Sequence, residues 1–133
     1  MNRTIVALAA LLAMAWPSRG AVTEETFELK TGADLIELCA VPDGDPLHAA
    51  AIHLCHGFGA GTYQTLQVLI ARGKLRQFFC PPEPGPSRNE AVAAFVAWGR
   101  AHPDLLQYSP AEVVGRYLIE TYPCPKKTAK KTK

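Results

Sequence analysis

The stretch LCHGFGAGTY, residues 54–63, decides how this 133-residue chain is interpreted. Its glycines and histidines suit a phosphate-binding loop, a metal site or the centre of a buried helix. A phosphate loop follows a strand and opens a helix, so that unpaired backbone amides face the anion. The preceding residues 46–52, PLHAAAI, already have the composition of a helix. We therefore interpret the stretch as the middle of a long helix.

Helical periodicity continues on both sides of this stretch. Apolar or small residues recur at alternating steps of three and four, at Leu47, Ala51, Leu54, Phe58, Gly61, Thr65 and Leu69. This is the period of one helix that presents one face to a core. A glycine inside a helix costs about 1 kcal/mol relative to alanine, so glycines here need a packing reason. We predict that Gly57 and Gly61 form a groove into which another helix or an aromatic ring packs.

The N-terminus has the organisation of a secretory signal peptide. Arg3 is followed by an apolar run from Ile5 to Ala15, and small residues stand at Ser18 and Gly20. The run is shorter than the roughly 20 apolar residues that span a bilayer. We predict that residues 1–20 are a signal peptide cleaved after Gly20 or Ala21. The mature protein is then periplasmic or secreted and has no membrane span.

The charge is divided between the domain and the C-terminal tail. Residues 21–125 hold 12 acidic and 7 basic residues, a net charge of 7 − 12 = −5, whereas residues 126–133 hold five lysines and no acid. The tail lacks aromatic residues that could stack on bases, and an acidic domain is unsuited to nucleic acid. We predict a disordered Lys-rich tail at 126–133 and no nucleic-acid partner.

Helix signals divide the remaining chain. Residues 22–30 are expected to be an extended lead, after which Thr31–Asp34 forms a capping box that opens the first helix. Asp45–Pro46 is expected to start the second helix, which is the longest and ends near Gly73.

Two further helices follow a proline-rich linker. Residues 81–86, PPEPGP, cannot form a helix or a ladder strand and predict a stiff, exposed connection. Capping boxes at Ser87–Glu90 and Ser109–Glu112 open the third and fourth helices. No stretch alternates long enough to predict a strand. The predicted fold is all-α, a small four-helix domain with a long central helix.

Four cysteines in an exported chain predict two disulfides. A short loop joins the third and fourth helices, which predicts that they are antiparallel and that Cys80 lies near Cys124. Cys39 is then left to pair with Cys55. In the chain-entropy model these two bridges contribute about 4 and about 3 kcal/mol, respectively.

Residues with catalytic or metal-binding chemistry are few. His53, Cys55 and His56 form one cluster, but zinc needs four ligands and Cys55 is assigned to a disulfide. Ser87 and Ser109 are assigned to helix caps. We therefore predict no catalytic residue, no cofactor and no metal.

The motifs DLIELC (34–39), Cys55-x-Gly-Phe-x-x-Gly61, Cys80–Pro81, His102–Pro103 and Tyr122–Cys124 together resemble the Rap/Tai family of type VI secretion immunity proteins. The resemblance covers about residues 28–125 and assigns residues 24–125 to the immunity domain. It implies a helical, non-catalytic periplasmic protein that blocks peptidoglycan amidases injected by neighbouring cells. The scaffold positions that it carries over are Cys39, Cys55, Gly57, Gly61, Cys80 and Cys124.

To block the active-site cleft of an amidase, this protein would need a stiff projection. Residues 81–89 are expected to supply it, with Glu83 and Arg88 as the partner-contact residues. A solvated connector without a partner is the alternative for this segment. The alternative function is a small periplasmic binding or acid-stress chaperone-like protein with no toxin partner, and a homodimer is a candidate assembly for either.

Overall fold

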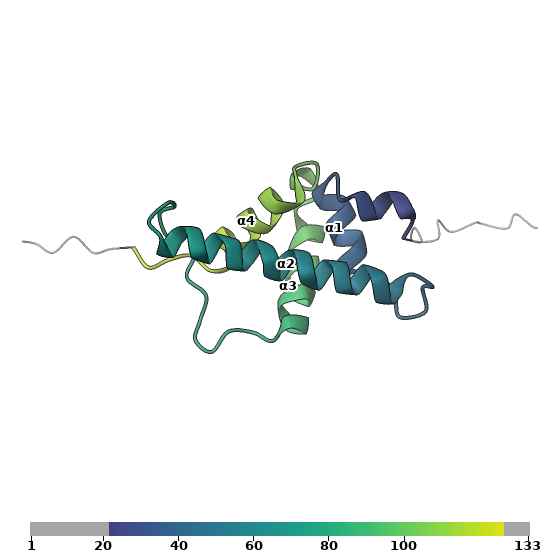
Figure 1. Cartoon of the computed structure of the whole chain (residues 1–133), viewed down its shortest axis with the longest axis horizontal. Coiled ribbons are helices and arrows are strands. Elements are labelled where there is room, and N and C mark those ends of the chain that lie inside the picture. The colour runs from purple at the N-terminus through teal and green to yellow at the C-terminus, as the bar shows by residue number, and fades with distance from the viewer. Residues whose placement is uncertain (1–21, 127–133) are drawn as a thin grey trace, which may run out of the picture.

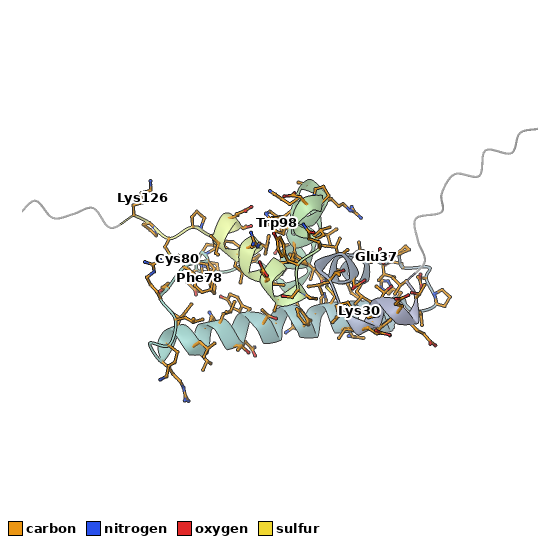
Figure 2. The ribbon with its side chains drawn as sticks, turned by 90° about the horizontal axis from the view of Figure 1, so that it is seen from above. Lys30, Glu37, Phe78, Cys80, Trp98 and Lys126 are labelled. Atoms are coloured by element: carbon orange, nitrogen blue, oxygen red, sulfur yellow. A yellow bond between two sulfur atoms is a disulfide. The ribbon has the colours of Figure 1, made fainter. Side chains whose placement is uncertain are left out.

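The computed structural model describes residues 22–126 and shows the predicted all-α fold. The elements are η1 (Glu24–Glu28), α1 (Gly32–Cys39), α2 (His48–Ala71), α3 (Arg88–Ala101), η2 (Pro103–Leu105) and α4 (Pro110–Thr121), where η denotes a 3-10 helix. Within residues 22–126 there is no strand. The long α2 lies along one side of the domain, and α1, α3 and α4 pack on the other side (Figures 1 and 2).

The short helix α1 is the centre of the core, because it packs against η1, α2, α3 and α4. Leu35 and Leu38 are its most buried residues, with 1% and 0% of their surface exposed. Leu35 belongs to a cluster with Phe95 of α3 and Val113 of α4. Leu38 belongs to a second cluster at the start of α2. These two contact surfaces on one short helix hold all four α-helices together.

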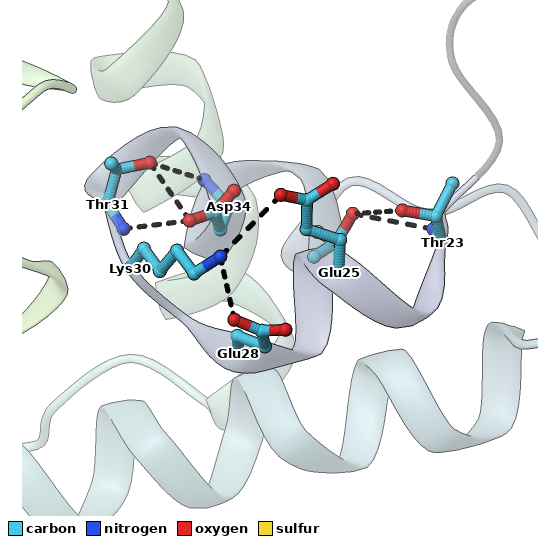
Figure 3. A network of polar contacts seen from close by, with 7 residues as sticks. Thr23, Glu25, Glu28, Lys30, Thr31 and Asp34 are labelled. Atoms are coloured by element: carbon cyan, nitrogen blue, oxygen red, sulfur yellow. Dashed lines mark hydrogen bonds and ion pairs between the residues drawn. The ribbon is translucent and has the colours of Figure 1, made fainter.

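The segment before α1 is not the extended lead that the sequence predicted. It forms the 3-10 helix η1, in which the backbone N–H of Thr23 donates to the hydroxyl of Thr26 at 3.4 Å. Leu29 then adopts a left-handed conformation with φ of 51°, which turns the chain into α1. Lys30 forms ion pairs with Glu28 at 2.7 Å and with Glu25 at 3.6 Å (Figure 3). Short-range side-chain contacts therefore favour a helical turn over extended backbone here.

Capping boxes at α1 and α3 form as predicted. The backbone N–H of Thr31 donates to Asp34 at 2.7 Å, and that of Ser87 donates to Glu90 at 2.8 Å. At α4 only half of the box forms. Ser109 accepts from the backbone N–H of Glu112, but the Glu112 carboxylate accepts instead from Arg116 at 2.7 Å.

The start of α2 differs from the prediction by two residues. Asp45 does not cap the helix; its carboxylate accepts from the backbone N–H of Leu47 at 2.8 Å, within a turn that precedes the helix. The helix begins at His48 and ends at Ala71, and Gly73 follows with φ of 67°.

The predicted groove at Gly57 and Gly61 is wrong. Both residues are exposed, and no atom of another element lies within 4 Å of the position of a Cβ atom at either residue. The buried residues of α2 are Ala51 and Cys55. Because α2 contains no Asp, Glu, Lys or Arg and carries small or apolar residues on both its core face and its outer face, its periodicity did not distinguish the two faces.

Close helix packing instead involves two other glycines. A Cβ atom at Gly32 of α1 would lie 2.5 Å from Cγ2 of Val113. A Cβ atom at Gly99 of α3 would lie 2.8 Å from Cγ1 of Ile36. Glycine is therefore needed where α1 meets α4 and where α3 meets α1.

Both predicted disulfides are confirmed, Cys39–Cys55 and Cys80–Cys124. The expected antiparallel pairing of α3 and α4 is not what brings Cys80 to Cys124. Phe95 contacts Tyr117 and Trp98 contacts Glu120, so the contacts advance in the same direction along two crossing helices. Cys80 reaches Cys124 because its backbone N–H donates to the carbonyl of Tyr122 at 2.7 Å.

No helix within residues 22–126 is long and apolar enough to cross a membrane. The predicted signal peptide at residues 1–20 lies outside the described residues. Of the Lys-rich tail, the structure describes Lys126 alone, which is exposed.

Candidate functional site

An apolar cavity of about 370 Å³ lies between α2, α3, α4 and the proline-rich segment. Leu35 of α1 and the Cys39–Cys55 disulfide are among its lining residues. The helices contribute mainly apolar side chains, which are Ala60 and Tyr63 from α2, Ala91, Val92 and Phe95 from α3, and Val114, Tyr117 and Leu118 from α4. The cavity is therefore bounded by elements far apart in sequence and held by the first disulfide.

Gly59 gives the cavity part of its space. It lines the cavity from the middle of α2, and no atom of another element lies within 4 Å of the position that its Cβ atom would occupy. A larger residue at this position would therefore extend into the cavity. Gly57, two residues earlier, does not line the cavity and is exposed. Two residues apart, the two glycines lie on opposite sides of the helix and so in different environments.

Tyr117 is the most buried polar group of the cavity. Its ring makes edge contacts with Phe95, Trp98 and Tyr122, with centroids 5.3, 5.8 and 6.2 Å away. The residue is 5% exposed, and within the described chain its hydroxyl has no hydrogen-bond partner. Burial raises the pKa of Tyr117 well above its ordinary value, and the nearby Tyr122 hydroxyl adds to this shift without reaching hydrogen-bonding geometry. The hydroxyl is therefore neutral at physiological pH and enclosed in the protein.

The two predicted partner-contact residues, Glu83 and Arg88, both lie at the edge of this cavity. Both are exposed, and neither forms an ion pair with another residue of the described chain. Burial, followed by the nearby Glu83 carboxylate, raises the pKa of Tyr63, whose hydroxyl accepts from Gln67 at 2.9 Å. The structure thus brings one acidic and one basic side chain to the rim of an apolar hollow.

The histidine and cysteine cluster of α2 does not assemble into a site. Cys55 is bonded to Cys39, His53 is exposed and His56 is half-buried. Within residues 22–126, no group of three or more His, Cys, Asp or Glu side chains is arranged to hold a metal ion. Ser87 and Ser109 serve as helix caps, as predicted.

A family model described as Rap1a immunity proteins matches residues 31–124. The chain belongs to the Rap1a immunity protein family. The matched region spans α1 to Cys124 and therefore includes both disulfides and the whole cavity. No curated protein and no solved structure gives a significant match. Membership of the Rap1a family implies binding to a protein effector, and proteins of this family are generally non-catalytic.

Sequence reasoning missed the cavity in this Rap1a protein. Tyr117 was not singled out, because its burial and its unpartnered hydroxyl depend on how α3 and α4 pack. Gly59 was overlooked between Gly57 and Gly61. The available signal was the presence of Gly59 itself, because a glycine inside a helix is unfavourable unless its position requires the absence of a side chain.

Proposed function

We propose that this Rap1a protein is a periplasmic, non-catalytic inhibitor of a peptidoglycan amidase delivered by type VI secretion. The observation that carries the proposal is the exposed proline-rich segment at the mouth of an apolar cavity. Inhibition by binding requires a surface that keeps its shape before the partner arrives, since ordering a mobile loop weakens association.

The proline-rich segment meets this requirement through its two anchored ends. The Cys80–Cys124 disulfide holds its start, and the capping box between Ser87 and Glu90 holds its end. Between these anchors, residues 82–86 are exposed and three of the five are prolines. Glu83 and Arg88 then supply polar contacts to an amidase at the two sides of the cavity.

The proposed periplasmic location is supported by the two disulfides, which persist in oxidising compartments. The signal-peptide pattern of residues 1–20 supports it independently. The net charge of −5 over residues 21–125 favours a basic partner, because complementary charge accelerates association.

A homodimer is proposed through the outer face of α2. Gly57 and Gly61 are exposed there, Val68 is 52% exposed, and the helix carries no Asp, Glu, Lys or Arg. A second copy packed across this face would cover it. Sedimentation velocity of wild type and of Gly61→Glu distinguishes a dimer that the charge disrupts from a monomer that it leaves unchanged.

The partner to test is a secreted peptidoglycan amidase, sought first among the genes that neighbour the gene of this chain. Directed to the periplasm of a susceptible host, it should lyse cells that lack this protein and spare cells that export it. The purified proteins should form a complex by isothermal titration calorimetry, and the complex should not hydrolyse peptidoglycan. Lysis despite export, together with no measurable heat of binding, would reject the proposed function.

A further inference from the structure

Resting on the proposed function, we infer that the effector anchors itself by inserting one apolar side chain into the cavity beside Gly59. At this contact the inhibitor does not insert a residue into the amidase but receives a side chain from it. The proline-rich segment can enter the amidase cleft while a residue from the rim of that cleft enters the cavity behind the segment.

The cavity has the size and lining of a binding pocket. Its volume of about 370 Å³ falls within the range of roughly 300–1,000 Å³ that is typical of ligand sites. The lining is mostly aliphatic and aromatic, and a few polar groups stand at its wall and rim. An apolar anchor in a desolvated pocket surrounded by a polar rim is the common arrangement of an interface hot spot.

The wall at Gly59 keeps this pocket open. Glycine is unfavourable inside a helix, and Gly59 has no neighbour whose approach would exclude a side chain. The space beyond its α-carbon is the cavity itself. An apolar group from a partner would fill the space that a leucine or methionine of this chain could have filled.

Tyr117 belongs to the wall of the pocket and not to its polar binding groups. The residue lines the cavity, but its hydroxyl oxygen is fully enclosed, so an atom of a partner does not reach it. The polar contacts of the pocket are therefore left to the exposed residues of its rim.

The rim favours a protein occupant over a small apolar molecule. Glu83 and Arg88 carry opposite charges at the mouth and are unpaired within the described chain. A protein segment that crosses the mouth offers both N–H donors and carbonyl acceptors to these two residues. A small apolar molecule inside the cavity would leave both of them in contact with water alone.

The test compares leucine substitutions at two glycines of the same helix. Gly59→Leu places its side chain in the cavity, whereas Gly57→Leu places the same side chain on the exposed face. Affinity for the proposed amidase partner is measured by calorimetry, and folding is checked by thermal unfolding. We expect Gly59→Leu to weaken binding at least tenfold and Gly57→Leu to change it less than twofold, with both variants folded.

The outcomes separate this inference from the proposed function. Wild type that does not bind the amidase overturns both. Wild type that binds, with Gly59→Leu binding equally well, overturns the inference and leaves the proposed function intact. A Gly59→Leu variant that loses binding of the fluorescent probe 1-anilinonaphthalene-8-sulfonate but keeps amidase binding also overturns it, since the cavity would then be a small-molecule site.

Discussion

Gly99 of α3 lies directly against Ile36 of α1, so that a Cβ atom at residue 99 would fall 2.8 Å from Cγ1 of Ile36. Both residues are buried, and Ile36 has 7% of its surface exposed. The contact joins the third helix to the helix at the centre of the core. The absence of a side chain at Gly99 therefore sets how closely these two helices approach.

Gly99→Ala should destabilise the protein by about 1–3 kcal/mol, because the added methyl group overpacks a filled core. Gly57→Ala is the matched control, since it adds the same methyl group to an exposed helical position with no neighbour within 4 Å. The control should stabilise the helix by up to about 1 kcal/mol. Urea unfolding monitored by circular dichroism gives both values, and equal effects at the two glycines would contradict this packing.

These two glycines show why the fold was predicted more successfully than the site. Capping boxes, prolines and an even set of cysteines act locally, so Thr31, Ser87 and the disulfide cysteines were identified from the sequence alone. Which side of α2 faces the core depends instead on the tertiary packing of the helices. The helix carries small or apolar residues on more than one side and contains no Asp, Glu, Lys or Arg, so its sequence left the direction of Gly57 undetermined. The packing of α1 against α2 determines it.

The cavity was beyond prediction for the same reason. Its lining comes from α2, α3, α4 and the proline-rich segment, with Leu35 and Cys39 of α1. Its lining residues come from segments that are far apart in the sequence, so no single stretch of sequence indicates the cavity. Glu83 and Arg88 were predicted as partner contacts because they are polar residues of the stiff segment 81–89, and the structure adds that both line the same cavity.

The two disulfides should differ in their resistance to reduction. Cys39 and Cys55 are 8% and 2% exposed, whereas Cys80 and Cys124 are only half-buried. A thiolate reductant must reach a sulfur atom, so Cys80–Cys124 should open first under native conditions. Timed reduction, alkylation and peptide mass spectrometry would show the order. Simultaneous loss of both bridges would indicate that reduction occurs only after global unfolding.

The hydrogen bond from the Trp98 indole to Glu120, 2.8 Å long, should stabilise the crossing of α3 and α4. Glu120→Ala should cost about 1 kcal/mol, because the indole N–H loses its acceptor. Glu112→Ala is the control on the same helix, since it removes only an exposed pair with Arg116 and should cost about 0.5 kcal/mol or less. Chemical unfolding followed by Trp98 fluorescence measures both. An equal cost for the two variants would assign no special role to the Trp98 contact.

The cap of α3 should make a small contribution to stability that depends on pH. Hydrogen bonds from the side chain and backbone of Ser87 lower the pKa of Glu90 below its ordinary value of 4.5. A carboxyl group whose pKa is lower in the folded state contributes stability above its unfolded-state pKa and loses it as the pH falls through the folded-state pKa. Glu90→Gln should therefore be less stable than wild type at pH 7, and the difference should vanish in acid below pH 4.5. Chemical unfolding of both proteins at several pH values between 7 and the acid range measures this stability difference. A difference that grows as the pH falls would contradict the prediction.

Replacing Pro82-Glu83-Pro84 by Gly-Ser-Gly should separate stability from partner binding. These three residues are exposed, so their loss should lower the melting temperature only slightly, mainly through a more flexible unfolded chain. The replacement removes the acidic rim group and loosens one wall of the cavity. Binding to the proposed amidase should weaken tenfold or more, which corresponds to about 1.4 kcal/mol.

The same replacement at Pro42-Asp43-Gly44, an exposed turn that does not line the cavity, should reproduce the small change in stability and leave affinity unchanged. If calorimetry gives equal affinities for the two variants, the interface lies away from the proline-rich segment, and the exposed residue Arg100 of α3 becomes the next position to substitute.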